Sequence, residues 1–175
     1  MKITLKKEHE KYFIYEDDRK IYYFEETKEQ GLISVFLKNM YNEEVRAMYQ
    51  IQRRNFDFFN KKSNGYTFYN QDEKLGELHY IKNGFDIKYH DIYYRFYGGK
   101  HANKNTIICL DRDVQIAEFV LGDHASVSFR NSNLNAEFAI LLYLFNFLLP
   151  FKQFDDKTYL YTYKGRYDDQ YDFEK

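Results

Sequence analysis

The stretch NAEFAILLYLFNFLLP, Asn135 to Pro150, is the most apolar run in this 175-residue chain, and it decides the expected fold. Its apolar part, Phe138 to Phe147 with Asn146 inside it, is well short of the roughly 20 residues that cross a bilayer. Runs of this length are more often buried core helices, and the Leu and Ala content favours a helix over a strand. We therefore expect a core helix over about residues 134–149 and no transmembrane segment.

The faces of this helix indicate how it is buried. From Phe138 to Leu149 apolar side chains cover every angular position, so no polar stripe remains for solvent and the helix must be surrounded by protein. Glu137 suits the positive end of the helix dipole, and Pro150 disfavours helical geometry at Leu149. Three polar residues are candidate caps for the start of the helix: Asn131, Ser132 and Asn133.

The rest of the chain, from Lys11 to Arg130, alternates apolar and polar residues with the period of a strand. Segments 45–52, 85–90 and 125–130 each have one apolar and one polar face, which is typical of antiparallel sheets. In the first segment Arg46 lies on the polar face. The apolar face of that segment is expected to comprise Val45, Ala47, Tyr49 and Ile51.

Turn residues divide this region into about twelve expected strands. The strands are expected near residues 12–16, 20–26, 32–38, 45–53, 56–60, 65–70, 74–81, 84–90, 92–97, 105–111, 114–121 and 124–130. The expected reversals lie at Asn64-Gly65, Asn83-Gly84, Gly98-Gly99, Asp111 to Asp113 and Gly122-Asp123.

A helix that is apolar on every side needs a wall around it, and too few other helices are expected to build one. Eight strands make a barrel filled by its own side chains and sixteen leave a channel, whereas about eleven or twelve can close around a helix. We predict a mainly β fold, a closed antiparallel barrel of about twelve strands around one central hydrophobic C-terminal helix. Residues 1–150 form this single domain. Residues 151–175 are a tail whose alternating tyrosines suit an extra edge strand or a partner-binding arm.

With this order of elements and the segment AEFAILLYLFNFLL, the chain resembles the tubby C-terminal-like fold from Lys11 to Pro150. That superfamily includes the tubby proteins, the LURP-one-related proteins and the phospholipid scramblases. Tubby domains bind phosphoinositide head groups and scramblases act at membranes, while the LURP-one-related branch is largely without an assigned activity. The resemblance therefore implies contact with membrane lipid, although no residue-specific motif of the family is present.

Head-group phosphates are held by clustered Lys and Arg side chains. Two basic clusters at expected loops or strand ends are candidates for this role, although basic hairpin turns also serve solubility and edge protection. The candidate ligand-binding residues are Arg53, Arg54, Lys61 and Lys62 in the first cluster, and Lys100 and Lys104, flanking His101, in the second.

Composition excludes several other classes of function. The 26 basic and 27 acidic residues give a net charge of −1, so we expect no nucleic-acid binding. The single cysteine, Cys109, suits a reducing compartment, and the charged N-terminal segment does not read as a secretion signal, so we expect a cytoplasmic protein. No catalytic or zinc-binding motif is found, which predicts no enzymatic activity, cofactor or metal.

Three functions remain open. The first is a non-enzymatic tubby-like domain that contacts anionic phospholipid or an unidentified protein through its rim. The second is a protein-interaction or immunity-type module that uses the Tyr-rich tail, and the third is a small barrel that binds an apolar ligand.

Overall fold

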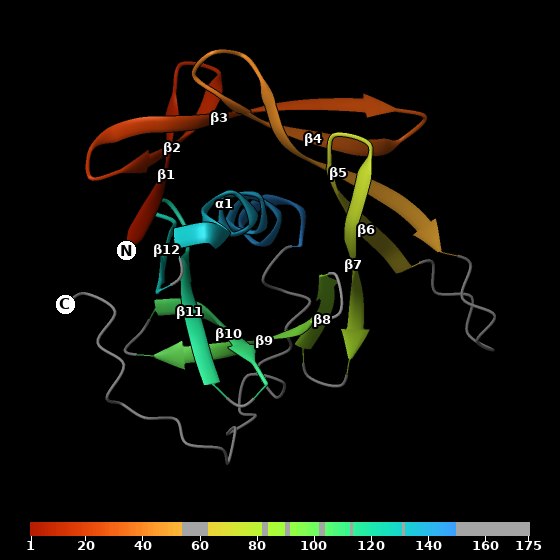
Figure 1. The fold of residues 1–175 in the computed structure, drawn as a ribbon, viewed down its shortest axis with the longest axis vertical. Helices are drawn as coiled ribbons and strands as arrows, with labels where there is room; N and C mark the ends of the chain where they lie inside the picture. Colours follow the sequence, from red (N-terminus) through yellow and green to blue (C-terminus); the bar gives the residue numbers. More distant parts are fainter. Residues whose placement is uncertain are drawn as a thin grey trace.

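The computed structural model describes residues 1–53, 63–81, 84–89, 92–101, 104–112, 114–130 and 132–149 (Figure 1). Twelve antiparallel strands form a closed barrel in which neighbours in sequence are neighbours in space, and the first strand pairs with the last. One helix lies inside the barrel (Figure 1). The predicted mainly β barrel around a C-terminal helix is confirmed.

The elements follow one another with short connections. The strands are β1 (Lys2–Glu8), β2 (Lys11–Glu16), β3 (Arg19–Glu29), β4 (Leu32–Asn39), β5 (Glu44–Arg53), β6 (Ser63–Asn70), β7 (Glu73–Ile81), β8 (Gly84–Tyr89), β9 (Ile92–His101), β10 (Lys104–Asp111), β11 (Val114–Leu121) and β12 (Ser126–Phe129). The central helix consists of a 3-10 turn η1 (Ser132–Leu134), the α-helix α1 (Asn135–Tyr143) and a π-helical turn η2 (Leu144–Leu148).

The number of strands was predicted, but not every strand. β1 was not expected, because its many charges hide the alternation of Ile3 and Leu5, which are both buried. The strand expected at 56–60 lies outside the described residues.

Two of the expected reversals are wrong. Asn64-Gly65 lies inside β6, opposite Gln52 and Ile51 of β5, and Gly98-Gly99 lies inside β9, opposite β10. Ladder pairing on the barrel wall overrides the local turn tendency of these dipeptides. The turns at Asp111 and Gly122 are confirmed, with Arg112 in the left-handed region at φ 55°. Of Asn83-Gly84 only Gly84 is described, as the first residue of β8.

The helix packs against the wall on several sides. Every residue from Ala136 to Phe145 is buried. The Phe138 ring lies edge-on to Phe119 and Phe129, with centroid distances of 5.7 and 5.0 Å, and the Phe145 ring is 5.3 Å from that of Phe96. Each fully buried Leu or Phe contributes roughly 1.5–3 kcal/mol, so the helix supplies much of the core.

The expected bounds of the helix are confirmed, but each end has a feature that was not expected. Leu134 precedes α1 and no side chain caps it, because the 3-10 turn η1 runs directly into α1. At the other end the N–H of Leu149 bonds to the carbonyl of Leu144 at 2.8 Å, which widens the last turn. Phe147 is consequently 37% exposed, so complete burial ends at Phe145. Among the described residues, no helix has the length and apolar content that crossing a bilayer requires.

The predicted apolar face of β5 is also wrong. Arg46 points into the barrel, where it bonds to Glu137 of α1, and Met48 on the same face is part of the core. Tyr49 is half-buried on the opposite face, whereas Val45 is half-buried and packs against the core. The carboxylate on the helix is the physical reason, because it gives Arg46 a buried partner. The predicted faces of 85–90 and 125–130 are confirmed: Phe85, Ile87, Val127 and Phe129 are all in the core.

The central helix generates a direct prediction. Leu142 has no exposed surface. Leu142→Asp is expected to prevent stable folding, because an unpaired buried charge costs several kcal/mol in a domain whose total stability is about 5–15 kcal/mol. Urea unfolding of the purified protein, together with its soluble yield, measures this loss. Val114→Asp, at a side chain that is 52% exposed, is the control and should unfold like the wild type.

Candidate functional site

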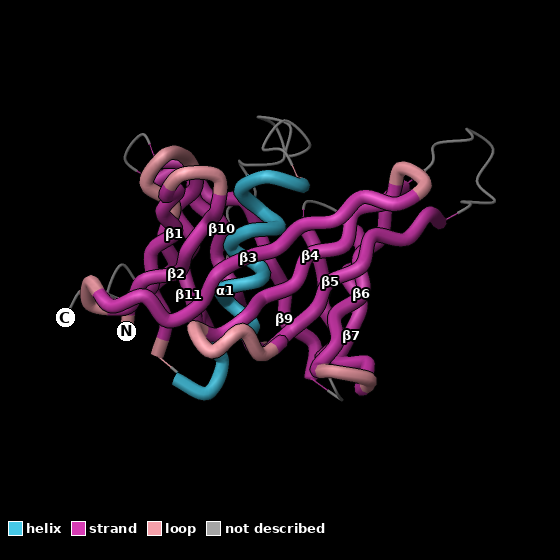
Figure 2. Tube along the Cα trace, turned by 90° about the horizontal axis from the view of Figure 1, so that it is seen from above, coloured by secondary structure: helices cyan, strands magenta, loops and turns pink. Residues whose placement is uncertain are grey.

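The two ends of the barrel are different, because strands that alternate in direction turn at opposite ends. We call the entry end the one where the helix begins, with turn residues 17–18, 40–43 and 71–72. We call the exit end the one where η2 finishes, with turn residues 9–10, 30–31 and 122–125. Figure 2 shows the helix running from one end to the other inside the strands.

The topology brings part of the predicted basic site to one end. Arg53 is the last residue of β5, Lys100 lies near the end of β9, and Lys104 begins β10. These backbone positions all belong to the exit end, with β6, β7 and β8 between the two clusters. Arg54, Lys61 and Lys62 lie outside the described residues, and only the backbone of the other three is described.

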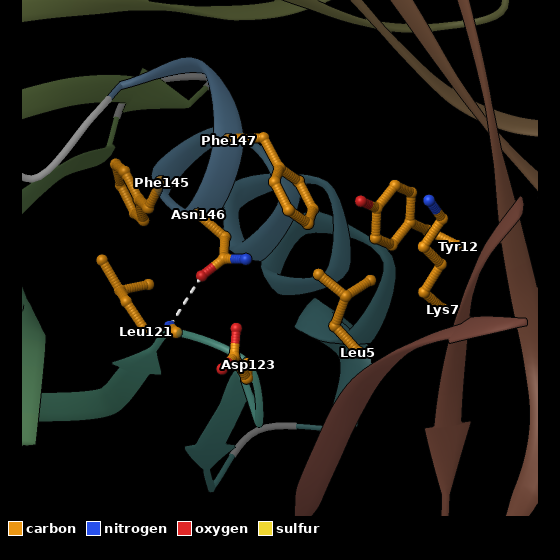
Figure 3. Close-up of a pocket in the computed structure, with 9 residues that line it drawn as sticks. Leu5, Lys7, Tyr12, Leu121, Asp123, Phe145, Asn146 and Phe147 are labelled. Atoms are coloured by element: carbon orange, nitrogen blue, oxygen red, sulfur yellow. Dashed lines mark hydrogen bonds between the residues drawn. The ribbon is translucent and has the colours of Figure 1, made fainter. Parts of the chain in front are cut away.

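A pocket of about 440 Å³ lies at the same end, beside the last turn of the helix (Figure 3). β1 contributes Leu5 and Lys7, β2 contributes Tyr12, and the β11–β12 turn contributes residues 121–123. The helix supplies the buried Phe145, and its π-helical turn also supplies Asn146 and Phe147, which reach the surface. The pocket therefore has an apolar wall with polar groups around it.

The polar groups of this pocket are held in place. The side-chain oxygen of Asn146 accepts a hydrogen bond from the backbone N–H of Gly122 at 2.9 Å. Its amide nitrogen points away from that bond, toward the space between Phe147 and Leu5 (Figure 3). The Lys7 ammonium lies 5.7 Å from the centre of the Tyr12 ring. Lys7 and Asn146 can therefore donate to an anionic group, while the exposed Asp123 carboxylate opposes one.

Sequence reasoning missed this pocket for two reasons. Lys7 belongs to β1, which was not expected to be a strand, and no sequence pattern predicts a π-helical turn at Asn146. The alternation of Ile3 and Leu5 is the one signal that could have placed Lys7 on the barrel.

A second polar cluster is buried near the entry end. One carboxylate oxygen of Glu137, Oε1, accepts hydrogen bonds from Arg46 Nε and Nη2 at 2.8 and 2.6 Å, and from the Tyr89 hydroxyl at 2.7 Å. Burial, followed by the bond to Glu137, raises the pKa of Tyr89 above its ordinary value of 10.0. The cluster ties α1 to β5 and β8, and this role in positioning the helix accounts for it without any chemistry.

The single cysteine of the chain lies in the core. Cys109 is fully buried, and burial raises the pKa of its thiol well above the ordinary value, so it is neither ionised nor accessible. Within the described ranges, no group of three or more His, Cys, Asp or Glu residues is arranged to hold a metal ion.

Comparison with known proteins gives no assignment: no family model, curated protein or solved structure matches the chain. The function has to be inferred from the residues themselves.

The Arg46–Glu137 pair predicts a non-additive effect on stability. Arg46→Met alone should cost about 3–5 kcal/mol, because it leaves the Glu137 carboxylate buried without its cation. Arg46→Met combined with Glu137→Met should recover much of that loss, since apolar replacements of buried ion pairs are often neutral. Chemical denaturation of the two variants measures both values. A double variant less stable than Arg46→Met would contradict this explanation.

The buried tyrosines predict loss of stability in alkali. The pKa values of Tyr89 and Tyr143 are raised, in each case chiefly by burial and next by a hydrogen bond to a carboxylate. Their stabilisation is present below pH 10.0, the ordinary value, and is lost as the pH rises from there toward the folded-state values. Denaturation midpoints measured between about pH 8 and 11 should fall above pH 10. The decrease of the midpoint above pH 10 should be smaller in Tyr89→Phe and in Tyr143→Phe. If the midpoint depends on pH in both variants as it does in the wild type, these tyrosines are not the cause of the alkaline loss.

Proposed function

We propose that the protein is a non-enzymatic, cytoplasmic tubby-like domain whose exit end contacts anionic phospholipid at a membrane surface. The observation that carries the proposal is the backbone placement of Arg53, Lys100 and Lys104 at one end of the barrel. Each Lys or Arg side chain near an anionic membrane surface contributes about 1 kcal/mol to the free energy of binding.

The β1–β2 hairpin adds described basic side chains to this end. Lys7 and Lys11 are exposed there, although Glu10 in the same turn is also exposed. The entry end has the opposite character, because its turns and adjoining strand ends carry mostly carboxylates. These are Glu16, Asp17, Asp18, Glu43, Glu44, Asp72, Glu73 and Asp111, against the basic residues Lys2, Arg19, Lys74, Arg112 and Arg130. This asymmetry would orient the barrel with its exit end toward an anionic surface.

The exit-end pocket supports a lipid rather than a free anion. Leu5 and Phe145 provide a buried apolar wall beside the Lys7 ammonium. Phe147 is partly exposed at the same place, and an aromatic ring at this position can enter the interfacial layer of a membrane. A phosphate would lie toward Lys7 and Asn146, with the glycerol and the first methylene groups against the apolar wall.

The other functions have less support. An apolar ligand inside the barrel would need the space that α1 fills, since Ala139, Leu142 and Leu144 are fully buried there. The Tyr-rich tail, residues 151–175, lies outside the described residues.

Vesicle co-sedimentation at low salt tests the proposal. The protein should bind vesicles containing phosphatidylserine or phosphoinositide, should not bind pure phosphatidylcholine, and should dissociate as the salt concentration rises. Lys100→Gln with Lys104→Gln should lower the partition coefficient roughly thirty-fold, the equivalent of about 2 kcal/mol for two cations.

The matched control is Arg19→Gln with Lys74→Gln, which makes the same change in charge at the entry end and should leave binding nearly unchanged. Asp123→Asn should strengthen binding, because it removes the carboxylate that faces the pocket. Absence of binding to every anionic vesicle at low salt would rule the proposal out, and equal losses in the two double variants would rule out the exit end.

A further inference from the structure

One strand of the barrel is longer than the neighbour it pairs with. The pairing between β2 and β3 ends at Phe13 and Tyr23, whereas β3 continues to Glu29. From Phe24 to Glu29 the strand is paired with β4 along one side, in register with Leu37 to Leu32. The barrel wall therefore opens between β2 and the second half of β3.

This opening leaves a free strand edge. Alternate residues of a strand direct their N–H and C=O groups to opposite sides, so half of these groups in residues 24–29 face β2. In the described part of the chain, no ladder pair or turn hydrogen bond occupies that side. Across the opening, Lys11 and Tyr12 are paired with β1 and likewise have no partner on β3. An unpaired edge of this kind is a template for another strand.

The opening is a groove rather than a filled seam. It has a volume of about 690 Å³, its two walls are residues 10–12 and 24–27, and Leu148 lies at its end. Its floor is aromatic: the rings of Phe24 and Tyr143 are 4.5 Å apart, those of Tyr12 and Phe147 are 4.5 Å apart, and those of Tyr143 and Phe147 are 4.9 Å apart. Apolar side chains of an added strand would pack on this floor.

The charge of the groove indicates which kind of segment would bind there. Glu10, Glu25 and Glu26 line it together with a single cation, Lys11. Glu25 is paired with Lys38 outside the groove, and Glu26 accepts a hydrogen bond from the Tyr143 hydroxyl at 2.8 Å. Lys28 and Glu29 continue this edge, so residues 10–11 and 24–29 together carry four carboxylates against two cations. An added strand with basic residues would meet this excess of negative charge, whereas an acidic strand would be repelled.

We propose that the β3 edge binds an extended, basic segment of a partner protein by strand addition. Backbone hydrogen bonds to residues 24–29 supply the affinity, and alternate side chains reach the aromatic floor while basic ones meet the carboxylates. The six-residue edge is about 20 Å long, which suits a short strand. The groove shares Tyr12 and Phe147 with the lipid pocket, but this proposal does not depend on the lipid contact.

The test uses a ten-residue peptide of alternating lysine and valine with the full-length protein. Hydrogen exchange should show new protection, when the peptide is added, of the alternate amides in residues 24–29 that face β2. The same peptide with glutamate in place of lysine should bind at least tenfold more weakly. A lysine–valine peptide that is N-methylated at every valine should also bind at least tenfold more weakly. It keeps the charge of the original peptide but lacks half of its backbone N–H donors.

Variants of the protein separate charge from packing. Glu10→Lys, in an exposed turn at the groove, should lower the affinity for the lysine peptide at least fivefold. Glu73→Lys at the entry end is the control, because it makes the same change in charge away from the groove. Absence of protection at about 1 mM peptide, or binding that leaves residues 24–29 unprotected, would overturn the proposal.

Protection of the β2-facing amides of this segment in the free protein would also overturn it. Protection that is lost on dilution would mean that a second copy covers the edge, and protection independent of concentration would mean that the chain covers it itself.

Discussion

The burial of an entirely apolar helix inside a sheet is the constraint on which the rest of the structure depends. α1 has no polar face, so the strands have to surround it, and a wall of this circumference closes only with about a dozen strands. The wall and the helix stabilise each other, because the inward side chains of the strands have no other surface on which to pack. The buried Arg46–Glu137 pair fixes the start of the helix in this wall.

At its C-terminal end the helix is no longer completely enclosed by the sheet. At η2 the turn widens, Asn146 and Phe147 reach the surface, and the wall loses continuity on both sides of the β1–β2 hairpin. Tyr12 and Phe147 border both openings. The pocket beside Lys7 and the groove beside β3 are therefore consequences of one geometric feature, the emergence of the helix from the barrel. Their different charges suit different ligands, an anionic head group in the first and a basic strand in the second.

The fold was largely predictable from sequence, because the length and faces of residues 135–149 require a closed wall. The site was not. Arg46 was placed outside because period-two alternation in β5 does not say which face is inside, and only the distant Glu137 decides it. Whether two turns share an end depends on the number of strands between them. With the expected strand at 56–60 between them, Arg53 and Lys100 would lie at opposite ends. The observed order places their backbones at the same end.

Orientation at a membrane tests the lipid contact most directly. An environment-sensitive dye can be attached to a cysteine at Asp123→Cys in the exit end, or at Asp72→Cys in the entry end, since Cys109 is fully buried and should not react. Contact through the exit end predicts a blue shift of emission with anionic vesicles for the label at position 123 and none for the label at position 72. A shift at position 72, or equal shifts at both, would contradict it.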